Sequence, residues 1–178
     1  MFTDGRSKKV IFIAHCILNQ NAISDGTADF SNLNKEVTEF LIKKDVGIIQ
    51  MPCPELCCLG LDRGNILGAE SEVVAENTRI RREISKSPVI DKLMFLVDYV
   101  ILQIKEYIKN DFHIAGIVGS NRSPSCGVET TSDNNKEIEG QGVFIEKLQE
   151  ALNKEKISIK FIGIKANENP IEKIKKIL

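Results

Sequence analysis

The stretch VIFIAH, residues 10–15, is nearly continuous in apolar side chains. Two later runs share this character, VGIIQM at 46–51 and IAGIVG at 114–119. Continuous apolar runs rich in Ile and Val are typical of strands that are buried on both faces, as in a parallel sheet. A fourth run, ISIKFIGI at 157–164, alternates more between apolar and polar residues. We therefore expect four strands, with the fourth at an edge.

Amphipathic segments separate these runs and predict helices at 33–45, 70–85, 89–110, 142–153 and 169–178. The first has Asn32 or Asn34 as a possible N-cap, and the last has Asn169. Ser87 and Pro88 predict a cap and a first-turn proline for the long helix. The positions expected to face the core are Leu33, Val37, Phe40 and Leu41; Ile90, Leu93, Met94, Val97, Ile101, Ile104 and Ile108; and Val143, Leu148 and Leu152.

The alternation of strands and helices predicts the fold class. It is typical of an α/β domain with a mostly parallel sheet of about four strands, in three layers, of the Rossmann or flavodoxin-like kind. The 178 residues are enough for one such domain, so we expect a single domain over 1–178. The polar stretch TTSDNNKEIEGQG at 130–142 is expected to be an exposed, mobile loop.

Composition narrows the range of partners. The formal net charge of −1 gives no general attraction to DNA or to an anionic membrane, and it makes a large RNA such as tRNA a less favoured substrate. No run has the length of a signal peptide or a membrane span, which predicts a cytoplasmic protein. Cysteines in that compartment usually stay reduced, so five of them favour metal binding or catalysis over disulfides.

Three cysteines follow three predicted strands. Cys16 comes directly after the first strand, Cys53 after the second, and Cys126 after the third and a short loop. Parallel strands bring the loops after them to the carboxyl edge, where open α/β sheets bind ligands. We therefore expect the three thiols to meet at one edge, whereas His113 begins the third strand at the opposite edge.

Three separated thiolates suit a [4Fe–4S] cluster with one iron left open, which can act as a Lewis acid. The sequence lacks the paired C-x2-C spacing that is usual for structural zinc. Cys57 and Cys58, in MPCPELCCLG at 51–60, either supply an additional ligand or pack as small apolar side chains.

Three motifs together resemble the TudS-type thiouracil and thiouridylate desulfidases in their short, single-domain form. They are HC-LNQN at 15–21, PCPE at 52–55 followed by LGLDR at 59–63, and SPSCG at 123–127. The resemblance extends from Cys16 to the last helix. It implies a [4Fe–4S] cluster held by Cys16, Cys53 and Cys126, whose fourth iron binds the sulfur of a thiolated pyrimidine. It also implies that the products are the uracil form and hydrogen sulfide.

Catalytic roles follow from the same resemblance. It assigns one to Glu55 and one to a serine of SPSCG, for which both Ser123 and Ser125 are candidates. A carboxylate two residues beyond a cluster ligand is placed to activate water or to move its proton. Pro52, Pro54 and Pro124 stiffen these loops, and Gly127 allows a close approach or a positive φ.

Substrate recognition needs additional polar residues near the same edge. Arg63 and Arg122 are expected to hold a phosphate. Asn19, Gln20 and Asn21 follow Cys16, where they either bind the pyrimidine edge or form turns and caps. The substrate favoured by this interpretation is 4-thiouridine monophosphate, with free thiouracil as a second possibility.

Two other functions are compatible with the sequence. One is a non-catalytic iron–sulfur or zinc protein, in which Cys57 or Cys58 supplies a further ligand. The other is a nucleotide-binding module whose cysteines are incidental. The sequence does not determine the oligomeric state.

Overall fold

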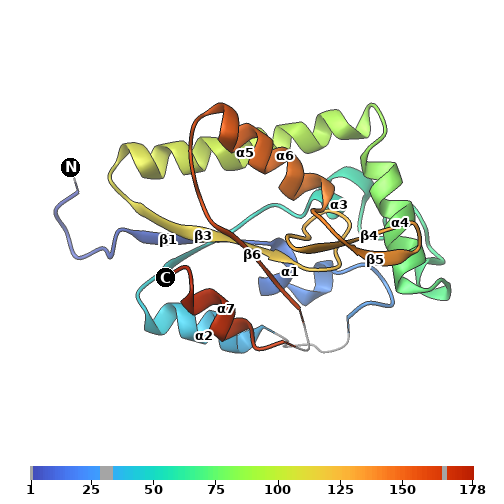
Figure 1. Ribbon diagram of the computed structural model, residues 1–178, viewed down its shortest axis with the longest axis horizontal. Helices are drawn as coiled ribbons and strands as arrows, with labels where there is room; N and C mark the ends of the chain where they lie inside the picture. The colour runs from blue at the N-terminus through green and yellow to red at the C-terminus, as the bar shows by residue number, and fades with distance from the viewer. Residues whose placement is uncertain (1, 29–33, 166–167) are drawn as a thin grey trace.

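Four parallel strands form the central sheet of the computed structural model, which describes residues 2–28, 34–165 and 168–178 (Figure 1). The strand order is β2-β1-β3-β6, and all three pairings are parallel. The bounds are β1 Lys9–Ile13, β2 Gly47–Gln50, β3 His113–Ser120 and β6 Phe161–Ile164. The predicted α/β class is therefore confirmed. The fourth strand is at an edge, as expected, but it covers only the second half of 157–164.

Helices cover both faces of this sheet. Figure 1 shows α5 (Val89–Lys109) and α6 (Val143–Lys154) on one side, and α2 (Lys35–Lys43) and α7 (Pro170–Lys175) on the other. Three shorter or peripheral helices are α1 (His15–Leu18), α3 (Pro54–Leu59) and α4 (Val73–Ile84), and the 3-10 turns are η1 (Gln20–Ala22) and η2 (Gly68–Glu70). No helix within the described residues is long and apolar enough to cross a membrane.

The core lies between the sheet and these helices. Ile11, Phe12 and Ile13 of β1 have no exposed surface, which fits a strand that is covered on both faces. The predicted inward positions of α6, namely Val143, Leu148 and Leu152, are buried. In α5 most of the predicted stripe is buried, but Ile108 is 43% exposed because it lies in the last turn.

Two of the predicted helix caps differ from the structure. Pro88 itself occupies the N-cap of α5, so Ser87 lies one residue outside the position from which a hydroxyl reaches the first turn. Asn34 is at the N-cap of α2, but its backbone is not extended and its side chain makes no capping bond. Asn32 and Leu33 lie outside the described residues. Asn169 does cap α7, because its side chain accepts the Glu172 N–H at 3.3 Å.

The stretch 130–142 was predicted wrongly as a loop. It contains an antiparallel hairpin of β4 (Thr130–Asp133) and β5 (Lys136–Glu139). Asn134 and Asn135 form the two-residue turn, both with positive φ, which is the conformation that such hairpins require. Thr131 and Ser132 are buried against α4 rather than exposed. The polar composition did not indicate strands, because the buried side chains of this strand pair carry hydroxyl groups.

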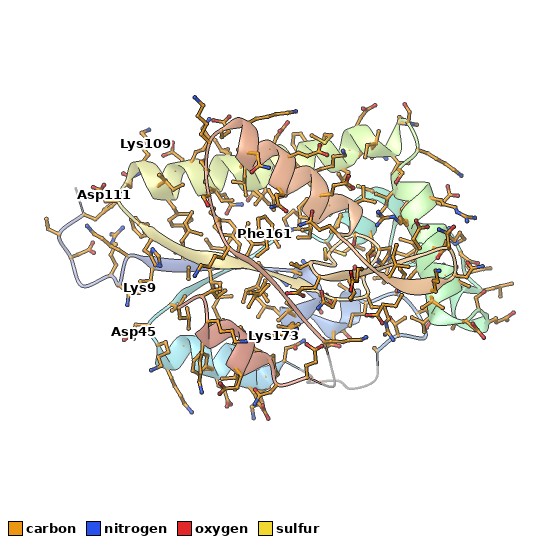
Figure 2. The ribbon with its side chains drawn as sticks, viewed as in Figure 1. Lys9, Asp45, Lys109, Asp111, Phe161 and Lys173 are labelled. Atoms are coloured by element: carbon orange, nitrogen blue, oxygen red, sulfur yellow. The ribbon has the colours of Figure 1, made fainter. Side chains whose placement is uncertain are left out.

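The direction of the strands places the two ends of the sheet. Lys9, Asp45 and Asp111, which begin or precede β1, β2 and β3, gather at one end of the molecule in Figure 2. The strands therefore carry the chain away from these residues, and the loops after β1, β2 and β3 lie at the other end. Strand order changes direction between β1 and β3, which is where α/β sheets form a crevice.

Candidate functional site

A cavity of about 510 Å³ opens at the carboxyl edge of the sheet. It is lined by residues that follow each of the four parallel strands, including Cys16, Cys53, Cys126 and Lys165. The volume is within the usual range for a small-molecule site. The three predicted cluster ligands, which are far apart in the sequence, therefore surround one space.

Each cysteine is placed by a different local structure. Cys16 lies in the first turn of α1, immediately after β1. Cys53 is the N-cap of α3, and its Sγ accepts the Leu56 N–H at 3.4 Å. Cys126 lies in the loop after β3, where the Ser125 hydroxyl is 3.6 Å from its Sγ. All three are free thiols.

The environment of these thiols favours their neutral form in the absence of a bound cation. Burial raises the pKa of Cys16 to about 11 and that of Cys53 to about 12, and the Glu55 carboxylate adds to both increases. Burial also raises the pKa of Cys126, with a further contribution from a negative charge on Cys16 or Cys53. The thiols are thus close enough to repel one another as thiolates, and a positively charged group would relieve that repulsion.

Glu55 connects the second and third cysteine segments. It is buried in the first turn of α3, and its Oε1 accepts the Ser125 hydroxyl at 2.6 Å and the Ser123 hydroxyl at 3.4 Å. The two serine oxygens are 3.3 Å apart. The structure therefore brings all three predicted catalytic residues together, beside Cys126.

The two serines differ in what else they contact. The Oγ of Ser123 accepts the backbone N–H groups of Ser125 at 3.3 Å and Cys126 at 3.0 Å, so it shapes the loop. Ser125 is 1% exposed and makes the short bond to Glu55. The geometry points to Ser125 as the serine coupled to the carboxylate. A side chain at Gly127 would overlap the backbone oxygens of Thr130 and Ser123, so this glycine permits a close approach.

Arg63 lies in the cavity wall, but its guanidinium is already used by the protein. It is 2% exposed, and its Nε donates to Glu55 Oε2 at 3.1 Å. Its Nη1 donates to the carbonyls of Gly60 and Leu61, and its Nη2 donates to that of Ala22. These contacts leave little donor capacity for a substrate phosphate, and the buried ion pair with Glu55 was not anticipated from sequence.

Arg122 is the predicted phosphate ligand that faces the cavity without such partners. Within the described residues its guanidinium has no hydrogen bond or ion pair, and its backbone has a φ of 70°. Ser132 donates to the Arg122 carbonyl at 2.7 Å, and the Arg122 N–H donates to Thr130 O at 3.1 Å. This non-glycine positive φ is thus held by bonds from the hairpin.

Lys165 is a cavity residue that the sequence reasoning missed. It follows β6, and its ammonium binds both carboxylate oxygens of Glu137 at 2.9 and 2.7 Å. Its position directly after the fourth predicted strand was the signal that could have identified it. Together with Arg122 it makes this side of the cavity positive, although Glu137 neutralises part of that charge.

Of the three polar residues after Cys16, only Gln20 lines the cavity. Its Nε2 donates to the Cys16 carbonyl at 2.9 Å, while its buried Oε1 has no donor among the described residues. Asn19 caps η1 by accepting the Asn21 N–H, and Asn21 is exposed. The turn and cap interpretation therefore describes Asn19 and Asn21 best. His15 also lies in the wall, 3.4 Å from the Asn19 amide.

Cys57 and Cys58 are not among the residues that line the cavity. Cys57 is exposed on α3, and Cys58 is buried in the hydrophobic core. A further ligand from either residue, as a closed iron–sulfur or zinc site would need, is not brought to the three thiols in this arrangement.

The donors that this cavity offers to a metal or a cluster are thiols. Within residues 2–28, 34–165 and 168–178, no group of three or more His, Cys, Asp or Glu side chains converges closely enough to hold a single metal ion. Three thiols that line one cavity could hold a [4Fe–4S] group. Cys16, Cys53 and Cys126 would hold it, and the cavity presents no fourth cysteine among the residues that line it.

Fold and site together define an α/β protein with a three-cysteine cavity at the carboxyl edge of its parallel sheet. The chain is 30% identical over 173 residues to the uncharacterized protein MJ0003 of the archaeon Methanocaldococcus jannaschii, covering 97% of this chain and 96% of that one. It belongs to the family of that protein. No protein-family model and no solved structure matches the chain significantly.

Proposed function

We propose that this protein is an iron–sulfur-dependent desulfidase of the TudS type, which removes sulfur from a thiolated pyrimidine nucleotide or base. The reaction exchanges the thiocarbonyl sulfur for a water oxygen and yields the uracil form and hydrogen sulfide, without net oxidation or reduction. The observation that carries this proposal is the single cavity that holds three free thiols together with Glu55 and Ser125.

The cofactor in this proposal is a [4Fe–4S] cluster on Cys16, Cys53 and Cys126. When bound, it supplies an open, thiophilic iron that polarises the carbon–sulfur bond and stabilises the leaving sulfur. The buried Glu55, Arg63 and Ser125 lie in the wall of the cavity, where charge interactions are stronger than in water. The Leu56 N–H, directed at the Cys53 sulfur, tunes the charge that this ligand carries.

Glu55 is the general base of the proposed reaction. Its Oε2 is held by Arg63, so Oε1 is the oxygen that receives a proton from the attacking water. Ser125, 2.6 Å from Oε1, relays that proton to the departing sulfur. The proton balance is complete, because one water supplies both hydrogens of hydrogen sulfide.

Substrate binding is assigned to the polar side of the same cavity. Arg122 binds the phosphate of a nucleotide, and Lys165 adds positive charge beside it. Gln20 lies next to Cys16 and is the residue of the three-amide motif that reaches the cavity. These placements favour 4-thiouridine monophosphate over free thiouracil.

Anaerobic purification tests the function directly. The protein should contain about four irons and four sulfides per chain, and adding 4-thiouridine monophosphate should release sulfide. A Cys16→Ser variant should lose the cluster, while Cys57→Ser/Cys58→Ser should retain both cluster and activity. A fully reconstituted protein that releases no sulfide from any thiopyrimidine would refute the catalytic role. Loss of the cluster in the Cys57/Cys58 variant would favour a closed, non-catalytic site.

A further inference from the structure

Arg63 is the largest of the fully buried side chains among the described residues, and the proposed chemistry does not use it as a reactant. It lies in a loop between α3 and α4 and has a positive φ of 56°. A buried arginine needs an acceptor for each of its N–H groups. Gly60, Leu61, Glu55 and Cys53 supply acceptors from the same stretch of chain, whereas the Ala22 carbonyl comes from a segment 41 residues away.

These acceptors connect the cysteine segments. Ala22, whose carbonyl accepts from Nη2, ends the η1 turn that follows Cys16. Glu55, which accepts from Nε, lies two residues after Cys53, and the Cys53 sulfur is 4.0 Å from Nη2.

Arg63 is connected to the Cys126 segment through the Glu55 carboxylate. Ser125 binds the other oxygen of Glu55 and immediately precedes Cys126. A continuous chain of hydrogen bonds therefore runs from Arg63 to the segments of all three thiols.

The planar fork of arginine is what this arrangement requires. Its donors point in fixed directions, so one side chain can hold a carboxylate and several carbonyls at once. A lysine ammonium keeps the charge but cannot reproduce that fork. Glu55, with Oε2 bound by Arg63, presents Oε1 to the serines.

We propose that Arg63 is the positioning residue of the thiol site: it orients the Glu55 carboxylate toward Ser125 and holds the Cys16 and Cys53 segments together. For the part that concerns Glu55, this inference rests on the proposed function. The part that concerns the thiols does not, because it predicts how the three cysteines are held in the protein whatever reaction follows.

Four variants test the proposal by a double-mutant cycle: Arg63→Lys, Arg63→Met, Glu55→Gln and Glu55→Gln/Arg63→Met. Arg63→Met should lower kcat about 10- to 100-fold, as expected when a supporting partner of a site residue is lost. Arg63→Lys should not restore it. With kcat expressed per bound cluster, removing Arg63 in the Glu55→Gln background should cause little further loss, because Arg63 acts on the reaction through Glu55. Losses that multiply in the double variant would overturn the positioning role.

Arg79→Met is the matched control. Arg79 also forms an ion pair with a glutamate, Glu76, and it anchors the same loop by donating to the Arg63 carbonyl at 2.8 Å. It does not line the cavity. Its loss should leave kcat and iron content close to those of the wild type. Equal effects of Arg79→Met and Arg63→Met would mean that only loop anchoring matters.

Readouts that are independent of activity separate this inference from the proposed function. If the wild type binds a cluster but releases no sulfide, the proposed desulfidase function is wrong. The iron and sulfide content of the same variants then tests the role of Arg63. If the wild type binds no cluster, the alkylation rate of Cys16, Cys53 and Cys126 by iodoacetamide, followed by peptide mass spectrometry, tests it. Alkylation should be faster in Arg63→Met than in Arg79→Met, and equal rates would overturn the proposal.

Discussion

The two serines beside Cys126 carry the same hydroxyl group but make different contacts. Ser125 is buried and bonded to Glu55 at 2.6 Å, whereas Ser123 accepts two backbone N–H groups of its own loop. Identical side chains two residues apart thus bind the Glu55 carboxylate in one case and shape the loop in the other.

Ser125→Ala should therefore lower kcat by about 10²-fold, within the range for loss of a proton-transfer group, while iron content stays unchanged. Ser123→Ala should instead lower the free energy of unfolding by about 1 kcal/mol, because it leaves two loop N–H groups without their acceptor. Steady-state sulfide release and urea unfolding of both variants provide the measurements. A larger loss of kcat in Ser123→Ala than in Ser125→Ala would mean that Ser123, and not Ser125, is the proton-transfer residue.

Arg122, which lines the cavity, is the residue at which the proposed binding of a phosphate can be tested. Arg122→Met should raise the KM for 4-thiouridine monophosphate about 10- to 100-fold, the usual value of a hydrogen bond to a charged group. The KM for 4-thiouracil should not change, because that base has no phosphate. Arg82→Met, an exposed arginine on α4, is the control. An equal rise in KM for the base and the nucleotide would mean that Arg122 does not bind the phosphate.

At the scale of elements, the β4–β5 hairpin supports the loop that carries Arg122 and Cys126. Thr131 donates to the Ser123 carbonyl at 3.0 Å, and Ser132 donates to that of Arg122 at 2.7 Å. Arg81 of α4 donates to Thr131 and to the Gln141 carbonyl, which ties the hairpin to the helix. The hairpin is therefore a support for the site rather than a mobile loop.

The turn of this hairpin gives a direct test. Asn135 has a φ of 57°, and its N–H donates to Thr78 at 2.9 Å. Asn135→Gly should keep the stability of the protein, because glycine adopts positive φ freely. Asn135→Val should lower the free energy of unfolding by about 1–2 kcal/mol, the cost of a left-handed conformation for such a residue. Urea unfolding of the two variants measures the difference, and equal stabilities would contradict this turn.

At the scale of the whole molecule, the three thiols make the free energy of unfolding depend on pH. Their pKa values in the folded protein lie above the ordinary value of 9.0, at about 11 for Cys16 and about 12 for Cys53. Below pH 9 both the folded and the unfolded chain keep these protons, so the thiols make their full contribution to the free energy of unfolding. Above pH 9 the unfolded chain loses them first, and the stability of the folded state decreases until the folded pKa is passed.

The cluster-free protein should therefore lose stability between pH 9 and pH 11, by about 1.4 kcal/mol per pH unit for each such thiol. Urea unfolding at pH 8 and pH 10 measures this loss. The Cys16→Ser/Cys53→Ser/Cys126→Ser variant provides the comparison, since lysines and tyrosines titrate in both proteins. If the two proteins lose stability equally, the thiols are not buried as described.

Local patterns in the sequence were sufficient for the sheet and for the meeting of the cysteines. Apolar runs indicate strands because a strand covered on both faces has no place for polar side chains, and parallel strands bring the residues after them to one edge. Cys16, Cys53 and Cys126 were predicted at one site on that basis alone. Glu55 and the serine loop were also foreseen, through the resemblance of their motifs.

Only the tertiary structure decided what each polar group near this edge contacts. The sequence suggested the same role for Arg63 and Arg122, but burial directs Arg63 to Glu55 and to backbone carbonyls, while Arg122 faces the cavity. Lys165 and the hairpin escaped prediction for a related reason. Periodicity reports which side chains avoid water, but the partner of a polar group is set by segments that folding brings together from distant parts of the chain.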